Sequence, residues 1–215
     1  MKLRIRVILT LIFISTLSWS QNLTEQVDII DKSIAKIFDS EKPGAVILIA
    51  KDGVPIYKKA YGLADYENKI PLNTSHSFAI GSLSKQFTAV AILLLDQYGK
   101  LSVDDDITKY FPNVPQFKGI SISNLLNHSS GIPDYFKIPE WRNDLTKDLS
   151  KEETFNLIKN QELEFVPGET NKYSNSGYHI LGMICEIVAK QTLNQFITGN
   201  ILKPLNMTET GFIDG

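Results

Sequence analysis

Ser82 and Lys85 stand three residues apart, a spacing that places two side chains on the same face of a helix. A serine hydroxyl is a weak nucleophile until a neighbouring base takes its proton. A lysine can act as that base only if burial and nearby cations lower its pKa, which is about 10.4 in water. The apolar pattern after Ser82 predicts a buried helix, whose N-terminus would also favour negative charge on the serine. The pair is therefore a candidate nucleophile and base.

A Ser-x-x-Lys spacing also arises by chance, and Ser33 with Lys36 forms a second copy. This copy lies in an amphipathic pattern that no strand precedes, so we interpret it as exposed surface. By itself, the spacing of Ser82 and Lys85 leaves a purely structural role open.

Tyr173 and Asn175 form a second candidate pair, just before another predicted helix. A tyrosine can shuttle a proton if an adjacent ammonium lowers its pKa from about 10. An asparagine side chain offers both a donor and an acceptor, which suits it to grip a substrate amide. Tyr66 and Asn68 repeat the spacing, and there we interpret the triplet as a turn.

His128 could be a general base, or it could be a buried histidine in a tight connection rich in serine. We favour the structural interpretation because a lysine and a tyrosine already supply candidate bases. His76 and His179 are interpreted in the same way. The three histidines have no metal-ligand spacing, so no metal site is predicted.

The elements that must position these residues follow from hydrophobic periodicity. A helix is predicted over residues 27–38, followed by strands at 45–50 and 56–61 that Asp52 and Gly53 join as a hairpin. From Ser82 onward the pattern predicts mainly helices, at residues 82–98, from 123, at 151–159 after a Ser150–Glu153 capping box, at 176–191 and at 193–202.

The first 20 residues differ from the rest of the chain. Three basic residues precede an apolar run at 7–14, and small residues follow two apart at Ser18 and Ser20. This pattern predicts a signal peptide over residues 1–20 and export to the periplasm or the extracellular space. The alternative is a membrane anchor, but the run is too short to cross ~30 Å of hydrocarbon as a helix.

Composition narrows the function further. The formal net charge is -2 and no basic stripe is present, which argues against nucleic acid as a partner. Cys185 is the single cysteine, so an internal disulfide is excluded. Its apolar helical surroundings predict a packed core thiol.

Four segments occur in a characteristic order, namely Ile80–Lys85, Leu125–Gly131, Tyr173–Tyr178 and Pro204–Thr210. Together they resemble the serine β-lactamase and penicillin-binding protein superfamily, in its class C β-lactamase, D-Ala-D-Ala carboxypeptidase and esterase branch. The resemblance runs from about Val27 to the last residue. It implies an α+β domain of the β-lactamase/DD-peptidase type over residues 21–215. In that fold the N-terminal helix and hairpin belong to an antiparallel sheet beside a large helical region.

The resemblance also implies roles for the candidate residues. Ser82 attacks a carbonyl to form an acyl-enzyme, and its backbone N–H supplies one oxyanion donor. Lys85 accepts or relays the serine proton, and Tyr173 protonates the leaving nitrogen or activates the deacylating water. The two groups titrate as a coupled pair, which leaves the choice of general base open. Asn175 binds the amide side chain of the substrate. No cofactor or metal is implied.

One family element is missing from this sequence. The family carries Lys or His, then Thr or Ser, then Gly, on a strand beside the nucleophile, and no such tripeptide stands in the right place. The resemblance implies that this element lies with the closing C-terminal strands of the sheet, which the 215 residues do not include. Losing an oxyanion donor typically costs 10²–10³ in rate. We therefore expect the 215-residue polypeptide to be a weak or inactive catalyst.

The preferred function is hydrolysis by acyl transfer outside the cytoplasm, on D-Ala-D-Ala peptides, β-lactams or small esters, by a monomer. One alternative is an inactive pseudo-enzyme that binds peptidoglycan or penicillin without turnover. The other is an α/β-hydrolase, which the absence of a Gly-x-Ser-x-Gly elbow at Ser82 disfavours.

Overall fold

A computed structural model describes residues 25–142 and 149–213, and the chain divides into two compact units, Met1–Phe78 and Ala79–Gly215. The predicted signal peptide at residues 1–20 lies outside the described residues. No helix within the described ranges is long and apolar enough to span a bilayer. The small antiparallel sheets lie in the first unit and the helical region in the second, which confirms the predicted α+β class.

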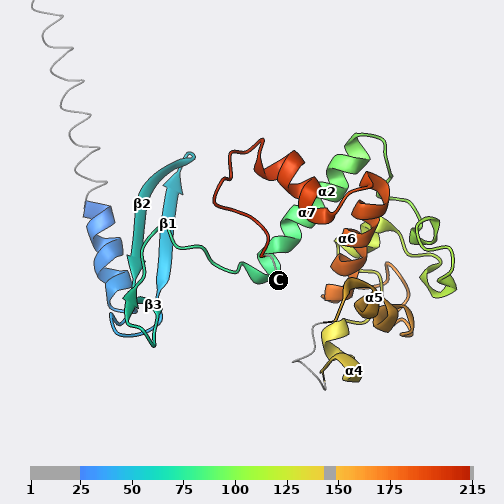
Figure 1. Cartoon of the computed structure of the whole chain (residues 1–215), viewed down its shortest axis with the longest axis horizontal. Helices are drawn as coiled ribbons and strands as arrows, with labels where there is room; N and C mark the ends of the chain where they lie inside the picture. The colour runs from blue at the N-terminus through green and yellow to red at the C-terminus, as the bar shows by residue number, and fades with distance from the viewer. Residues whose placement is uncertain (1–24, 143–148, 214–215) are drawn as a thin grey trace, which may run out of the picture. The chain divides into compact units, whose positions relative to one another are not determined.

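The first unit contains the predicted hairpin (Figure 1). Strand β1, Ala45–Lys51, pairs antiparallel with β2, Val54–Tyr61, with a bulge between Ile49 and Ala50. Asp52 and Gly53 both have positive φ, at 51° and 76°, as a tight two-residue hairpin turn requires.

A shorter antiparallel pair follows, formed by β3, Leu63–Asp65, and β4, Ile70–Pro71. The residues between them make a turn, in which the Asn68 backbone N–H and side-chain amide both donate to the Asp65 carboxylate, at 2.9 and 2.7 Å. This confirms the turn interpretation of Tyr66 and Asn68.

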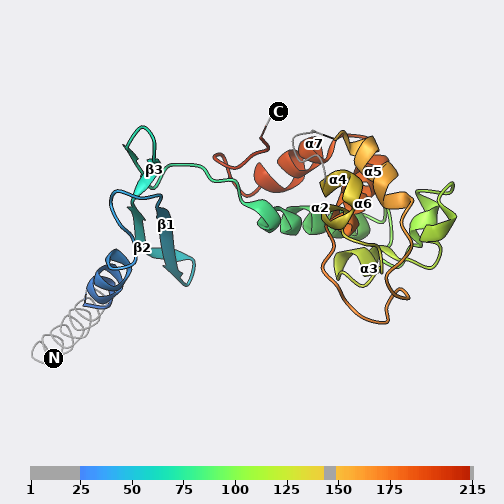
Figure 2. The same cartoon turned by 90° about the horizontal axis from the view of Figure 1, so that it is seen from below.

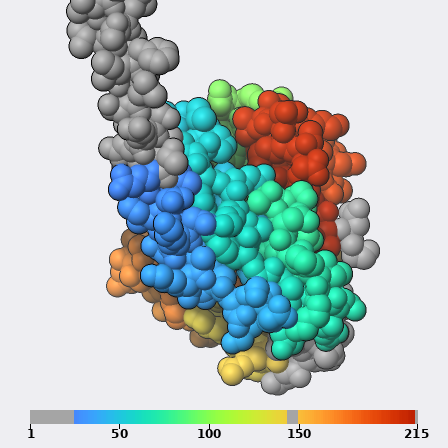
Figure 3. All heavy atoms as spheres, turned by 90° about the vertical axis from the view of Figure 1, so that its left-hand side faces the viewer, coloured from blue at the N-terminus to red at the C-terminus, as the bar shows by residue number. Residues whose placement is uncertain are grey.

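The first helix packs against this hairpin through Asp31. The carboxylate accepts hydrogen bonds from the Tyr57 and Tyr61 hydroxyls, at 2.8 and 2.6 Å, and from Lys59 Nζ at 2.6 Å. Figure 3 shows the helix residues in blue against the hairpin in cyan. The helix covers residues 25–35 rather than 27–38, because Phe38 leaves the helix to stack on the Tyr61 ring.

The second unit is built around α6, Asn175–Ala189, which contacts α2, α3, α5 and α7 (Figures 1 and 2). The core-facing side chains Ile180, Leu181, Ile184 and Cys185 of α6 are fully buried, as is the Ser176 hydroxyl at its first turn. Burial raises the pKa of the Cys185 thiol to about 12, which confirms the prediction of a packed core cysteine. The remaining α-helices are α2 Lys85–Gln97, α3 Ile122–Leu126, α4 Pro139–Arg142, α5 Lys151–Lys159 and α7 Leu193–Ile197.

Short turns of other helix types connect these elements. They are the 3-10 helices η1 Gly81–Ser84, η2 Ile107–Lys109, η3 Pro115–Phe117 and η4 Tyr135–Lys137, and the π-helix η5 Thr198–Leu202. The capping box of Ser150 and Glu153 is present as predicted. In this unit the predicted bounds of α2 and α6 were wrong. Ser82 lies in the 3-10 turn before α2 rather than in the α-helix itself, and α6 stops at Ala189, because Lys190 takes a left-handed conformation.

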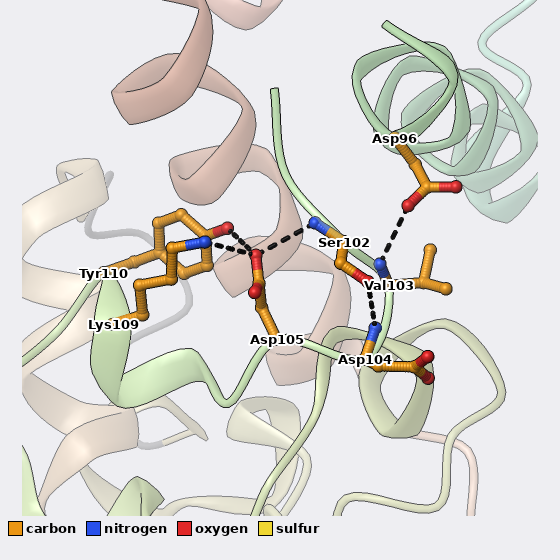
Figure 4. Close-up of polar contacts among 7 residues, drawn as sticks. All are labelled: Asp96, Ser102, Val103, Asp104, Asp105, Lys109 and Tyr110. Atoms are coloured by element: carbon orange, nitrogen blue, oxygen red, sulfur yellow. Dashed lines mark hydrogen bonds and ion pairs between the residues drawn. The ribbon is translucent and has the colours of Figure 1, made fainter. Parts of the chain in front are cut away.

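The loop after α2 is organised by Asp105 (Figure 4). Its Oδ2 atom accepts hydrogen bonds from the Ser102 N–H at 2.9 Å, Lys109 Nζ at 2.8 Å and the Tyr110 hydroxyl at 2.6 Å. Asp96 receives the Val103 N–H at 3.1 Å and so joins the loop to the end of α2. This arrangement fixes the chain between α2 and α3.

Candidate active site

The serine and lysine are presented by the turn that opens α2. Gly81 has φ of +51°, a left-handed conformation that side chains other than glycine rarely adopt, and it leads the chain into η1. Lys85 is the first residue of α2, and its Nζ atom lies 3.3 Å from Ser82 Oγ. Ser82 is exposed and Lys85 is half-buried, so the desolvation expected for this pair is partial. The Ser82 backbone N–H has no partner among the described residues and can donate to an oxyanion.

Tyr173 reaches this turn at the end of an irregular segment, residues 163–172, which contains a turn at residues 166–169 and is called the strap below. The strap runs along residues 128–131, and three backbone hydrogen bonds of 2.8–2.9 Å hold the two segments together, Glu164 to Gly131, Gly168 to Ser129 and Lys172 to His128. A Cβ atom on Gly131 would lie 2.2 Å from the Phe165 carbonyl oxygen, so glycine is required for this close approach. These contacts fix the strap against residues 128–131 and so position Tyr173 beside Ser82.

The four residues predicted to share a site lie together. The Tyr173 hydroxyl is 2.6 Å from Ser82 Oγ, and Lys85 Nζ donates to Asn175 Oδ1 at 2.7 Å. The lysine ammonium also lies over the Tyr173 ring, 5.0 Å from its centroid, and over the Tyr178 ring at 5.7 Å. A hydroxyl, a phenol and an ammonium within this range can exchange a proton directly.

The phenol at this site titrates more readily than a free tyrosine. Burial raises the pKa of Tyr173, but Lys85, the hydrogen bond with Ser82 and the lysine charge lower it by more, so the net pKa falls below its ordinary value of 10.0. A lowered pKa makes the phenolate form of Tyr173 more accessible, and a phenolate 2.6 Å from a serine hydroxyl can take the serine proton.

Sequence reasoning did not find Asp134, which is buried and faces Asn175. Both carboxylate oxygens accept from Asn175 Nδ2 at 3.1 Å, and Oδ1 also receives the backbone N–H of Phe136 at 3.2 Å. Asp134 is the N-cap of the short helix η4. In the sequence, an aspartate after Gly131-Ile132-Pro133 therefore indicates only a turn or a helix cap. That signal predicts a cap, and it contains no information about Asn175, which lies 41 residues away.

His128 packs behind the tyrosine. Its ring centroid is 4.6 Å from that of Tyr173 and 5.2 Å from that of Tyr178, and its Nδ1 accepts the Ser174 backbone N–H at 3.3 Å. Burial, with the charge of Lys85, lowers the pKa of the imidazole, which favours the neutral form that can accept this bond. The contacts fit the structural interpretation of His128.

The other candidates considered from the sequence have separate surroundings. Ser33 Oγ donates to the Ile29 carbonyl within the first helix, at 2.7 Å. His76 Nδ1 receives the Asn73 backbone N–H at 3.0 Å, and His179 Nε2 lies 3.0 Å from the Lys151 carbonyl oxygen. Among the residues that the structure describes, no group of three histidine, cysteine or acidic side chains is arranged to hold a metal ion.

Comparisons with known proteins point to one family. The family model described as Beta-lactamase matches residues 21–215. Protein flp of Staphylococcus aureus (strain N315) is 37% identical over 178 residues, which cover 79% of this chain and 35% of that protein. Penicillin-binding protein 4* of Bacillus subtilis (strain 168) is 36% identical over 168 residues, covering 76% and 37%.

The fold is also similar to solved structures. EstCE1, whose structure is described as that of a hydrolase with promiscuous acyltransferase activity, matches with a TM-score of 0.73 and 27% identity. The match covers 86% of this chain and 52% of that one. The chain thus spans about a third of the length of the curated relatives that it matches, and about half of this structural relative.

Proposed function

Because the chain belongs to the beta-lactamase family, we propose that Ser82 is the nucleophile of a serine acyl-transfer hydrolase. The observation that carries this proposal is the 2.6 Å separation of Ser82 Oγ and the Tyr173 hydroxyl, next to the half-buried Lys85 ammonium. The similarity to a penicillin-binding protein and to the hydrolase EstCE1 supports the same reaction class. The proposed substrates are D-Ala-D-Ala peptides, β-lactams or small esters.

The proposed acylation step moves one proton and exchanges two bonds. Ser82 Oγ attacks the carbonyl carbon while its proton passes to the coupled pair of Tyr173 and Lys85. The carbonyl oxygen becomes an oxyanion, and the Ser82 backbone N–H donates to it. Collapse of this intermediate breaks the amide or ester bond, and the proton held by the pair passes to the leaving nitrogen or oxygen. An acyl group then remains on Ser82.

Deacylation uses the same residues in the opposite direction. Tyr173 and Lys85 take a proton from a water molecule, whose oxygen attacks the acyl carbon, and they return the proton to Ser82 Oγ as the acid product leaves. Asn175 is proposed to touch the substrate amide, with its Oδ1 shared between that amide and Lys85. No cofactor is proposed.

The competing proposal is a binding protein without turnover. The 215-residue polypeptide has no Lys/His-Thr/Ser-Gly tripeptide beside Ser82 to provide the second oxyanion donor. Loss of one such donor typically costs 10²–10³ in rate. We therefore propose that this polypeptide, taken alone, acylates slowly and turns over poorly. Its partners would be a small molecule or a peptidoglycan peptide.

The site of action is proposed from the N-terminal pattern. The basic start and short apolar run within residues 1–20 support export to the periplasm or the extracellular space. The proposed protein is a monomer without nucleic-acid partners. Recovery of a chain lacking residues 1–20 from the exported fraction of producing cells would support this proposal, and an uncleaved cytoplasmic chain would contradict it.

Covalent labelling tests the proposed nucleophile. The chain is incubated with a fluorescent penicillin and, separately, with a fluorophosphonate that reacts with activated serines without needing a particular substrate pocket. Peptide mapping by mass spectrometry should place the adduct on Ser82. Ser82→Ala should abolish labelling, whereas the matched Ser33→Ala variant, which removes the other Ser-x-x-Lys serine, should label normally.

The fate of the penicillin adduct separates the two proposals. An adduct lost over minutes with release of hydrolysed product supports a hydrolase, and an adduct that persists supports a binding protein. Equal labelling of the two serine variants would overturn the assignment of Ser82.

A further inference from the structure

Asn175 lies between two groups with opposite hydrogen-bonding character. On one side both oxygens of the Asp134 carboxylate are 3.1 Å from Asn175 Nδ2. On the other side Lys85 Nζ is 2.7 Å from Asn175 Oδ1. An ionised carboxylate can only accept hydrogen bonds and an ammonium can only donate them. The amide therefore has a single satisfactory orientation, with its nitrogen toward Asp134 and its oxygen toward Lys85.

Asp134 is itself held firmly in place. It is only 8% exposed, and the Phe136 and Asn175 backbone N–H groups both donate to its Oδ1, at 3.2 and 3.4 Å. The residues on either side of Asp134 are hydrogen-bonded to Ser176 of α6. The Ser176 hydroxyl donates to the Pro133 carbonyl at 2.5 Å and accepts the Tyr135 N–H at 2.9 Å. The carboxylate is thus a fixed reference point at the start of α6.

The amide also keeps the two charges apart. Among the ion pairs found within residues 25–142 and 149–213, none joins Lys85 to a carboxylate. Lys85 Nζ instead donates to the neutral amide oxygen of Asn175, and it donates as well to Ser82 Oγ. A direct ion pair with a carboxylate would hold the ammonium away from the serine and would favour its charged form.

We propose that Asp134 is a positioning residue of this site, which acts through Asn175 to direct the amide oxygen at Lys85 and so keeps the ammonium beside Ser82. This inference rests on the proposed function of Ser82 and adds to it a residue that need not touch substrate. If the Asn175 side-chain amide were rotated by 180°, its NH₂ group would face the Lys85 ammonium. Repulsion between the two groups would then displace Lys85 from Ser82.

The test compares Asp134 with Asp106, which has the same local role elsewhere in the unit. Asp106 caps the 3-10 helix η2 by accepting the Thr108 N–H, as Asp134 caps η4. Asp134→Ser retains a good capping side chain but removes the carboxylate that holds Asn175 Nδ2. Asp134→Asn retains one acceptor oxygen and should have an intermediate effect. Asp106→Asn is the control for loss of a capping carboxylate.

The first readout is the rate constant for fluorophosphonate labelling of Ser82 in each folded variant, measured with and without Asn175→Ala. Asp134→Ser should slow labelling about 10- to 100-fold, as expected for losing a hydrogen bond to a charged group. In the Asn175→Ala background the same change should cost no more than about twofold, because the residue through which Asp134 acts is gone. Equal losses in both backgrounds, or no loss in the first, would overturn the inference. Asp106→Asn should label at the wild-type rate.

The second readout does not depend on catalysis. In a ¹⁵N-labelled chain, the side-chain amide resonances of Asn175 are identified by their disappearance in Asn175→Ala. They should shift in Asp134→Ser and stay in place in Asp106→Asn, and unchanged resonances in Asp134→Ser would overturn the inference. A wild-type chain that does not label at Ser82 would refute the proposed function, and the resonances would then decide the role of Asp134 by themselves.

Discussion

Aspartate, lysine and tyrosine side chains lie close together in the loop after α2 and again at the candidate active site, and the pKa values of the two tyrosines are shifted in opposite directions. In the loop after α2, Lys109 and Tyr110 both donate directly to Asp105 Oδ2, at 2.8 and 2.6 Å (Figure 4). Burial raises the pKa of Tyr110, and the hydrogen bond and charge of Asp105 raise it further. At the candidate active site, by contrast, the pKa of Tyr173 lies below its ordinary value.

The difference lies in what the carboxylate touches. Asp105 binds both partners itself, so its negative charge opposes ionisation of the phenol and neutralises the ammonium. At the active site Asn175 stands between Asp134 and Lys85. Burial and the charge of Asp134 raise the pKa of Tyr173, but Lys85 and the hydrogen bond with Ser82 lower it by more. The same three residue types therefore hold a loop together by hydrogen bonds in one place and form a candidate proton-transfer site in the other.

Replacing the tyrosine of each cluster by phenylalanine, one at a time, should give the largest difference in labelling rate. We expect Tyr173→Phe to slow acylation of Ser82 by about 10²–10⁴-fold, the usual contribution of a positioned general acid or base, with little change in unfolding. Tyr110→Phe, the matched change, should leave labelling of the folded chain unchanged and lower the free energy of unfolding by about 1 kcal/mol. Labelling rates and urea unfolding of both variants measure this. A Tyr173→Phe chain that labels at the wild-type rate would contradict the comparison.

Asn175→Asp should make the active site resemble the Asp105 cluster. A carboxylate would then contact Lys85 directly, and near neutral pH we expect labelling to fall about 10- to 100-fold. The new carboxyl group would lie beside Asp134, and two adjacent carboxylates favour uptake of one proton. A protonated side chain at position 175 can donate to Asp134 and present its carbonyl oxygen to Lys85. The rate relative to wild type should therefore recover as the pH falls.

A pH series of labelling rates for wild type and Asn175→Asp checks this expectation. A rate ratio that does not depend on pH would mean that the charge of the new group is not the cause of the loss.

The sequence predicted features that depend on neighbouring residues well, and it predicted contacts between residues far apart in the chain poorly. Ser82 and Lys85 were found because a spacing of three residues has a direct meaning on a helical turn. The hairpin at Asp52 and Gly53 was found because its turn requires positive φ. Both signals are contained within a few residues. The start of α2 was misplaced, because the chain tightens into η1 at a point where hydrophobic periodicity alone does not distinguish helix types.

Asp134 could not be found in the same way. Its local signal, a cap before η4, is the same as that of Asp106 before η2, although only Asp134 faces Asn175. The two aspartates differ because the segment that contains Asp134 contacts a segment 41 residues away, which contains Asn175. No periodic pattern in the sequence encodes that contact. Tyr173 was placed beside Ser82 by the resemblance of ordered motifs rather than by spacing. The strap that precedes Tyr173 has a local turn signal at Pro167 and Gly168, but that signal does not indicate that the strap pairs with residues 128–131.

Asp105→Asn should have the smallest effect, and it should be seen in stability rather than activity. Hydrogen bonds with Lys109 and Tyr110 lower the pKa of Asp105 from 3.8 to about 2. A carboxyl group whose pKa is lowered by folding contributes stability above its unfolded pKa and loses it as the pH falls through its folded pKa. The variant should unfold with about 1 kcal/mol less free energy near neutral pH, because Lys109 is largely exposed and adds little.

Urea unfolding at a series of pH values tests this last expectation. The difference in free energy between wild type and Asp105→Asn should be constant above about pH 5 and should shrink toward pH 2, because the folded-state pKa lies at about 2 and the unfolded one at 3.8. The labelling rate of the folded variant should equal that of wild type throughout. A slower rate would mean that the Asp105 loop positions the active site, and the separation of the two clusters into a structural and a chemical one would then fail.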